Sequence, residues 1–212
     1  MATATARADA VRRGVRPEVV TVLWMAAEAA LAIGAGIAAR SVLLTAFGFD
    51  SLIELLSGAV LLSLLMAESR GVSLRRVEHL ELRTTRISAV LLILLCVYVV
   101  ATSIVGLAFG LKPEGSILGL AVTAVAVVVM PLLAAAKSRV NRIVESPALR
   151  ADIAETATCA YLAGVTLAGV GLSTFLGLWW VQYIAALALL IWLVPETREA
   201  LESADWRISR DG

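Results

Sequence analysis

The sequence predicts an all-α polytopic membrane protein with six transmembrane helices and both termini in the cytoplasm. Of its 212 residues, 60% are hydrophobic and 17% are charged, which is far from the composition of soluble globular domains. Six apolar stretches reach the length of about 20 residues that a bilayer core of about 30 Å requires. Lys and Arg residues gather in alternate connections between these stretches, which gives the chain a direction in the membrane.

The borders of the six stretches follow from hydropathy and from helix-ending residues. The expected spans are residues 18–39, 42–67, 86–110, 115–137, 148–172 and 177–195. Gly110 to Gly115, "GLKPEG", reads as a tight turn, Ser146 and Pro147 as the cap and first turn of the fifth span, and Pro195 as the end of the sixth. The apolar segment after residue 17 is too long for a signal-peptide core, so we expect no cleaved signal.

Positive charge sets the orientation. Sixteen of the 18 Lys and Arg residues, Lys137 among them, fall in the amino-terminal arm, the second and fourth connections or the tail, and only Arg40 and Lys112 lie on the other side. The positive-inside rule therefore places both termini in the cytoplasm. We expect a basic cytoplasmic arm (1–17), one transmembrane transport domain (18–196) and a short cytoplasmic tail (197–212), as a multi-pass protein of the plasma membrane.

Acidic residues interrupt the apolar spans. Asp50 and Glu54 lie in the second span, Glu155 in the fifth with Asp152 nearby, and Glu28 in the first. A charge at mid-bilayer costs about 2.5–3.5 kcal/mol on insertion scales, so such acids usually face a partner or a polar cavity. These acids are therefore candidate functional residues.

Spacing brings two pairs to the same depth. At about 1.5 Å per residue, Asp50 and Glu54 lie roughly 12 and 18 Å below the outer surface, while Glu155 and Cys159 lie roughly 12 and 18 Å above the inner surface. Each pair is spaced i,i+4 and shares one helical face. If the second and fifth spans pack together, the four side chains meet near the midplane and offer carboxylate and thiolate ligands to a divalent cation. Protons compete for the same atoms, which is the basis of a proton-coupled exchanger.

Other interpretations of these residues stay open. Asp50 and Glu54 could be a structural pair that is bonded to hydroxyls such as Thr45 or Ser57, and Cys159 could be a packing residue. Asp152 could be a helix-start acid or line the cytoplasmic access to the site.

Three further residues, Glu28, His79 and Cys96, are interpreted separately. Glu28 could be a ligand, a proton relay or a structural hydrogen-bond acceptor. His79, the one histidine, could form an accessory site or lie on a solvated helix face. Cys96 is expected in the core.

Two stretches carry a family resemblance. "SVLLTAFGFDSLIELLSGAV" and "LRADIAETATCAYLAGV" resemble the second and fifth transmembrane helices of the cation diffusion facilitator family, and the resemblance extends over roughly residues 18–196. Asp50 and Glu54 match the D-x-x-x-D type pair of that family's transport site, while Glu155 and Cys159 match its H-x-x-x-D type pair. The histidine and the family's cytoplasmic domain are absent, as in a shorter six-helix subgroup, and the cysteine favours softer ions such as zinc or cadmium.

The resemblance implies a homodimeric metal exporter that works by alternating access, with a divalent cation, zinc by expectation, as its substrate and protons as the exchanged ion. We expect no cofactor and no nucleic-acid partner. An enzyme is not expected, because no G-x-S-x-G or H-E-x-x-H motif is present. Two alternatives remain, namely a metal-binding sensor or scaffold without flux, and a proton-coupled transporter of organic cations.

Overall fold

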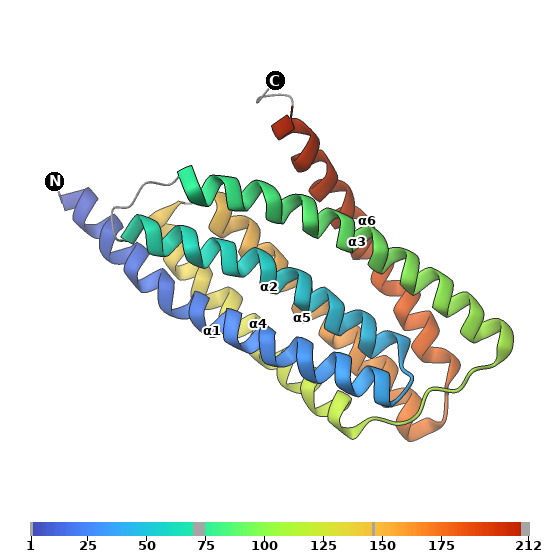
Figure 1. The fold of residues 1–212 in the computed structure, drawn as a ribbon. Coiled ribbons are helices and arrows are strands. Elements are labelled where there is room, and N and C mark those ends of the chain that lie inside the picture. Colours follow the sequence, from blue (N-terminus) through green and yellow to red (C-terminus); the bar gives the residue numbers. More distant parts are fainter. Residues whose placement is uncertain (1, 70–74, 146, 209–212) are drawn as a thin grey trace.

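The chain forms six long α-helices. The computed structural model describes the backbone of residues 2–69, 75–145 and 147–208, and the side chains of residues 15–67, 86–143, 145 and 149–202. The helices are α1 (Ala2–Ala38), α2 (Val42–Ser69), α3 (Arg75–Phe109), α4 (Ile117–Val144), α5 (Pro147–Leu176) and α6 (Trp180–Ile208) (Figure 1). Within the described residues, each helix contains a stretch long and apolar enough to cross a membrane. The predicted all-α, six-helix, multi-pass fold is therefore confirmed.

Apolar side chains cover the outside of the helix bundle as well as its core. Leu23, Val97 and Ile191 are exposed on their helices, and 28% to 39% of each candidate span is buried inside the chain. A helix satisfies its own backbone hydrogen bonds, which is a requirement in lipid. The outward apolar faces are therefore suited to lipid contact.

The helices extend beyond the predicted spans. α1 begins at Ala2 instead of residue 18, α3 begins at Arg75 instead of residue 86, and α6 continues past Pro195 to Ile208. Hydropathy marks only the part of a helix that lies in the apolar layer, whereas a helix can continue into water. The prediction that Pro195 ends the sixth helix is wrong, because a single proline can be accommodated inside a helix at the loss of one backbone hydrogen bond.

Two of the connections are closed by the same hydrogen-bond pattern. After α1, Arg40 has a φ of 53° and the Ser41 N–H donates to Gly36 O over 2.8 Å. After α3, Gly110 has a φ of 62° and the Leu111 N–H donates to Gly106 O over 2.9 Å. Both are Schellman motifs, which satisfy the last carbonyls of a helix. After α1 the turn leads directly into α2, which packs antiparallel to α1, whereas residues 111–116 run as an extended connection from α3 to the start of α4 (Figure 1).

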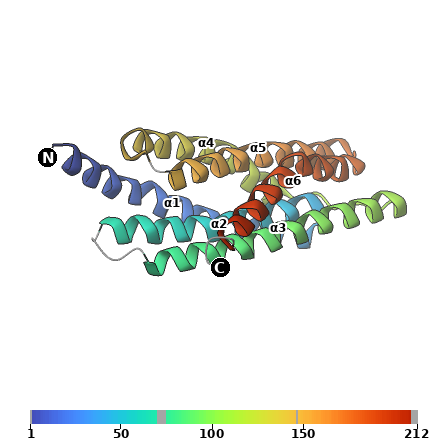
Figure 2. The same ribbon diagram turned by 90° about the horizontal axis from the view of Figure 1, so that it is seen from above.

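The six helices pack as three pairs. α1 pairs with α2, α4 with α5, and α3 with α6; the first two pairs join through α1 with α4 and α2 with α5. Figures 1 and 2 show α3 and α6 crossing each other beside this four-helix group. α2 contacts α1, α3, α5 and α6. The helix that carries Asp50 and Glu54 is thus central and adjoins the helix that carries Cys159.

Gly36 permits the close contact between α1 and α2. A Cβ atom at Gly36 would lie 2.6 Å from the Thr45 backbone nitrogen, closer than nonbonded atoms can approach. The missing side chain lets the two backbones meet, which fixes α2 against α1 just above the level of the acids.

Candidate metal centre

Asp50 and Glu54 lie one turn apart on α2 and face the protein interior. Asp50 is 2% exposed and Glu54 is 5% exposed, although both carry carboxyl groups in the middle of a span that runs from Val42 to Ala67. The i,i+4 spacing places both on one face of α2, and this face is directed toward α5. The predicted shared face of the two acids is present in the structure.

Cys159 on α5 completes a compact group with these two acids. Its side chain is fully buried, and ligand atoms of Asp50, Glu54 and Cys159 all lie within 4.8 Å of one another. Among the described residues, these three form a group of the size that can hold one metal ion. Two carboxylates and one sulfur from two antiparallel helices are a ligand set that suits zinc or cadmium.

The carboxylate of Asp50 has no hydrogen-bond partner among the described residues. Both of its oxygens and Oε2 of Glu54 are buried and accept no hydrogen bond from the described residues. The hydroxyl of Thr45, one of the alternative partners, donates instead to Ser41 O over 2.8 Å. Since an unpaired buried polar group is costly, such groups in a native fold call for an additional partner, such as an ion or a proton.

Glu28 on α1 borders the group but is itself fully hydrogen-bonded. Its Oε1 accepts from the Ser51 hydroxyl over 2.8 Å and from the Cys159 thiol over 3.7 Å, and its Oε2 accepts from the Trp24 indole N–H. Glu28 therefore ties α1 to α2 and α5 and orients the thiol. Of its three interpretations, the structure supports the hydrogen-bond acceptor.

Glu28→Gln should lower thermal stability more than it lowers metal affinity. The substitution replaces an acceptor oxygen by an amide that cannot accept from both Trp24 and Ser51, which costs about 1–3 kcal/mol for a buried group left without its partner. Thermal unfolding in detergent and Zn²⁺ titration on the same sample measure the two effects. A loss of Zn²⁺ affinity as large as that of Asp50→Asn would instead identify Glu28 as a ligand.

The structure does not bring Glu155 into the three-residue group. Glu155 is half-buried and lies one turn toward the start of α5 from Cys159, and residues four apart are separated by about 6 Å along a helix. Its carboxylate is not among the ligand atoms that lie within 4.8 Å of one another, although its charge acts on both Asp50 and Glu54. The charged groups that act on Glu155 are Asp152, Lys137, Glu196 and Glu199.

Glu196 on α6 is a neighbour of the site that the sequence did not indicate. Its charge acts on both Asp50 and Glu54. The prediction that the sixth helix ends at Pro195 excluded Glu196 from the membrane, whereas α6 continues through both residues. An acid directly beside the predicted end of an apolar span was the available signal.

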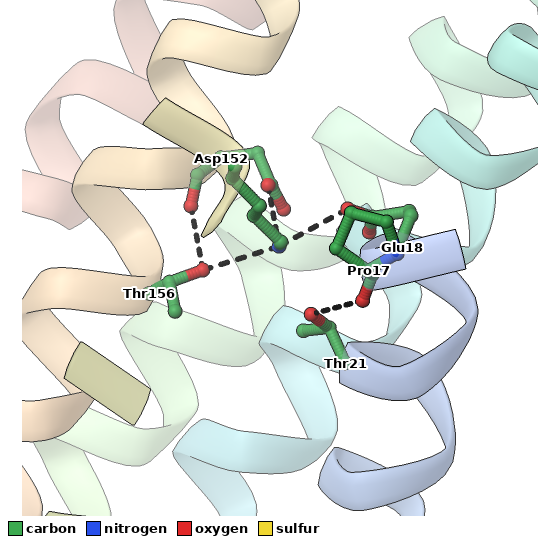
Figure 3. Close-up of polar contacts among 6 residues, drawn as sticks. Pro17, Glu18, Thr21, Asp152 and Thr156 are labelled. Atoms are coloured by element: carbon green, nitrogen blue, oxygen red, sulfur yellow. Dashed lines mark hydrogen bonds and ion pairs between the residues drawn. The ribbon is translucent and has the colours of Figure 1, made fainter. Parts of the chain in front are cut away.

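A second polar cluster lies between α1, α4 and α5. The Lys137 ammonium on α4 is 3.1 Å from Oε2 of Glu18 on α1 and 2.5 Å from Oδ2 of Asp152 on α5, and it donates to the Thr156 hydroxyl over 3.3 Å. Figure 3 shows these contacts meeting at one nitrogen atom, with Asp152 and Thr156 on one side and Glu18 on the other. We refer to Glu18, Lys137, Asp152 and Thr156 as the lysine cluster.

The lysine cluster corrects two expectations. Lys137, counted with a cytoplasmic connection, lies inside α4 and is 1% exposed. Asp152 is buried as well, and its carboxylate pairs with an ammonium, a contact that neither of its two interpretations, a helix-start acid or a residue lining the cytoplasmic access, included. Hydropathy places the border of a span at a charged residue. The prediction therefore ended the fourth span at Lys137 and counted this residue with those exposed to water. The signal missed was that Glu18, Lys137 and Asp152 all lie near the cytoplasmic ends of their predicted spans.

Two remaining residues have simple outcomes. Cys96 is half-buried and packs against the main core, as expected, with its sulfur 3.7 Å from the Thr197 hydroxyl oxygen. The side chain of His79 lies outside the described residues.

In comparisons with known proteins, neither a protein-family model nor a curated protein matches this chain.

Proposed function

We propose that this protein is a proton-coupled exporter of divalent metal cations, with Zn²⁺ or Cd²⁺ as substrate, in which Asp50, Glu54 and Cys159 hold the ion between α2 and α5. The observation that carries the proposal is the buried carboxylate of Asp50, which has no hydrogen-bond partner among the described residues and has a ligand atom within 4.8 Å of those of a second acid and a thiol. In the proposed orientation, both termini lie in the cytoplasm, and the chain works as a homodimer in the plasma membrane by alternating access.

Competition between metal and protons supplies the coupling. Three anionic ligands inside a low-dielectric span cannot all stay charged and unpaired, because each uncompensated charge is costly there. Protons neutralise the ligands when no ion is bound, and a divalent cation replaces these protons when it binds. Exposing the site alternately to the two sides then exchanges metal for protons.

Zn²⁺ binding should release protons from the protein. Isothermal titration calorimetry in buffers of different ionisation enthalpy measures this number, and the apparent Zn²⁺ affinity should fall as the pH is lowered, because protons then compete more strongly for the ligands. A Zn²⁺ affinity that is independent of pH, with no proton release, would contradict the coupling mechanism.

The transport test uses vesicles with an acidic lumen and Zn²⁺ outside. An exporter that exchanges metal for protons should accumulate Zn²⁺, and collapse of the pH gradient by an ionophore should stop the accumulation. A sensor or scaffold should bind Zn²⁺ without this flux. An organic-cation transporter should instead move a fluorescent organic cation in the same vesicles and show no Zn²⁺ flux.

A further inference from the structure

The lysine cluster contains more negative than positive charge. Two carboxylates, on Glu18 and Asp152, lie on either side of the single ammonium of Lys137, and all three residues are buried. Glu18 pairs with the ammonium at 3.1 Å through Oε2, while its buried Oε1 has no hydrogen-bond partner among the described residues. The cluster therefore contains a carboxylate oxygen that Lys137 does not pair with.

The oxygen atoms of the cluster form a cation site that already holds a cation. Carboxylate oxygens from α1 and α5 and a hydroxyl from α5 converge on the Lys137 nitrogen at 2.5–3.3 Å. Hard divalent cations such as Mn²⁺ and Mg²⁺ prefer ligands of this oxygen type. In this structure the ammonium group occupies the position that such an ion would take.

The cluster lies between the candidate metal centre and the end of the bundle where α1 and α5 begin. Glu18 precedes Glu28 by ten residues on α1 and Asp152 precedes Cys159 by seven on α5, which corresponds to about 15 and 10 Å along the helices. Thr156 is less than one turn from Cys159. An ion that follows α5 from this end toward Cys159 would therefore pass the cluster.

We propose that Glu18, Asp152 and Thr156 form a second, oxygen-lined site for divalent cations, and that the tethered ammonium of Lys137 occupies it and keeps metal ions out. The site itself is independent of the transport activity. Its placement on the ion path rests on the function proposed above.

Removal of the ammonium should therefore create measurable metal binding. The test uses the full-length chain with Asp50→Asn and Glu54→Gln, so that the candidate metal centre does not contribute, and titrates it with Mn²⁺ followed by electron paramagnetic resonance. Adding Lys137→Gln or Lys137→Met should raise the Mn²⁺ affinity at least about tenfold, because a positive charge within a few ångströms of the ion is removed. Adding Asp152→Asn as well should abolish the gain.

Each outcome decides the proposal. Lys137→Gln is included because its amide can still donate hydrogen bonds to the carboxylates where Lys137→Met cannot. Variants that fold only in the presence of Mn²⁺ support the proposal, since a ligand that binds the native state stabilises it. Folded variants with no gain in affinity, a gain that survives Asp152→Asn, or failure of both variants to fold with or without Mn²⁺ overturn it. Since the candidate metal centre is disabled throughout, none of these results depends on transport.

Discussion

Asp50→Asn should abolish Zn²⁺ accumulation in vesicles with an acidic lumen and leave the protein folded. The introduced amide keeps the size of the side chain but cannot carry the negative charge that attracts the ion. Loss of a group that only orients a ligand already costs 10- to 100-fold in metal affinity, so loss of a ligand should cost at least about 100-fold. Calorimetric Zn²⁺ titration and vesicle flux measure the two losses, and size-exclusion chromatography checks the fold.

Glu114→Gln is the matched control for this prediction. Glu114 is an exposed acid in the connection between α3 and α4, so its neutralisation changes the total charge equally without touching the candidate metal centre. It should transport Zn²⁺ like the wild type. If Asp50→Asn keeps both affinity and flux, the ion is not held between α2 and α5. If it loses binding and the wild type shows no flux, the protein is a sensor.

Lys137→Met should cause a large loss of stability in the absence of metal. The substitution leaves the carboxylates of Glu18 and Asp152 buried without their cation, and breaking a buried ion pair by removing one partner typically costs about 3–5 kcal/mol. Thermal unfolding in detergent, followed by circular dichroism, should show a markedly lower midpoint. Adding Glu18→Gln and Asp152→Asn should restore part of the loss, because the unpaired charges are then removed.

Arg139→Met is the control on the same helix. Arg139 is exposed two residues beyond Lys137, and exposed charges contribute between 0 and about 1 kcal/mol. Its midpoint should stay near that of the wild type. Equal midpoints for Lys137→Met and Arg139→Met would show that the contacts of the buried ammonium contribute no more than a surface charge.

The fold was predictable because a membrane imposes one dominant constraint. An apolar segment in lipid must be helical, so hydropathy alone gave six helices in their correct places. It did not give their ends, since the parts of α1, α3 and α6 outside the apolar layer are helical without being hydrophobic. Pro195 gave a wrong helix end for a different reason. A proline ends a helix only where the residues after it also leave the helical conformation.

The candidate site was predictable in part. The unusual presence of Asp50 and Glu54 in an apolar run indicated α2, and the i+4 spacing from Glu155 indicated Cys159. The structure places Cys159 beside both acids and leaves Glu155 outside this three-residue group, because the tilt and rotation of a helix are set by packing against its neighbours. Residue spacing within one helix contains no information about these two quantities.

The lysine cluster shows what such reasoning misses. Lys137 is separated by more than a hundred residues from Glu18 along the chain, and each partner looks like an ordinary charge at the border of a span. Only the packing of α4 between α1 and α5 makes them neighbours. Comparing the depths of opposite charges across all predicted spans would have indicated the contact.

For the proposed ion site, the division of its ligands between two helices has a mechanical consequence. Asp50 and Glu54 are fixed to one rigid rod, so their mutual spacing stays constant when α2 moves, whereas Cys159 belongs to a different rod. Sliding α5 against α2 by a fraction of a helical turn would move the Cys159 sulfur away from the carboxylates of Asp50 and Glu54. The affinity for a bound ion would then fall although the ligands themselves stay the same. The relative position of α2 and α5 would then control ion release, and the same three side chains would both bind and release the ion.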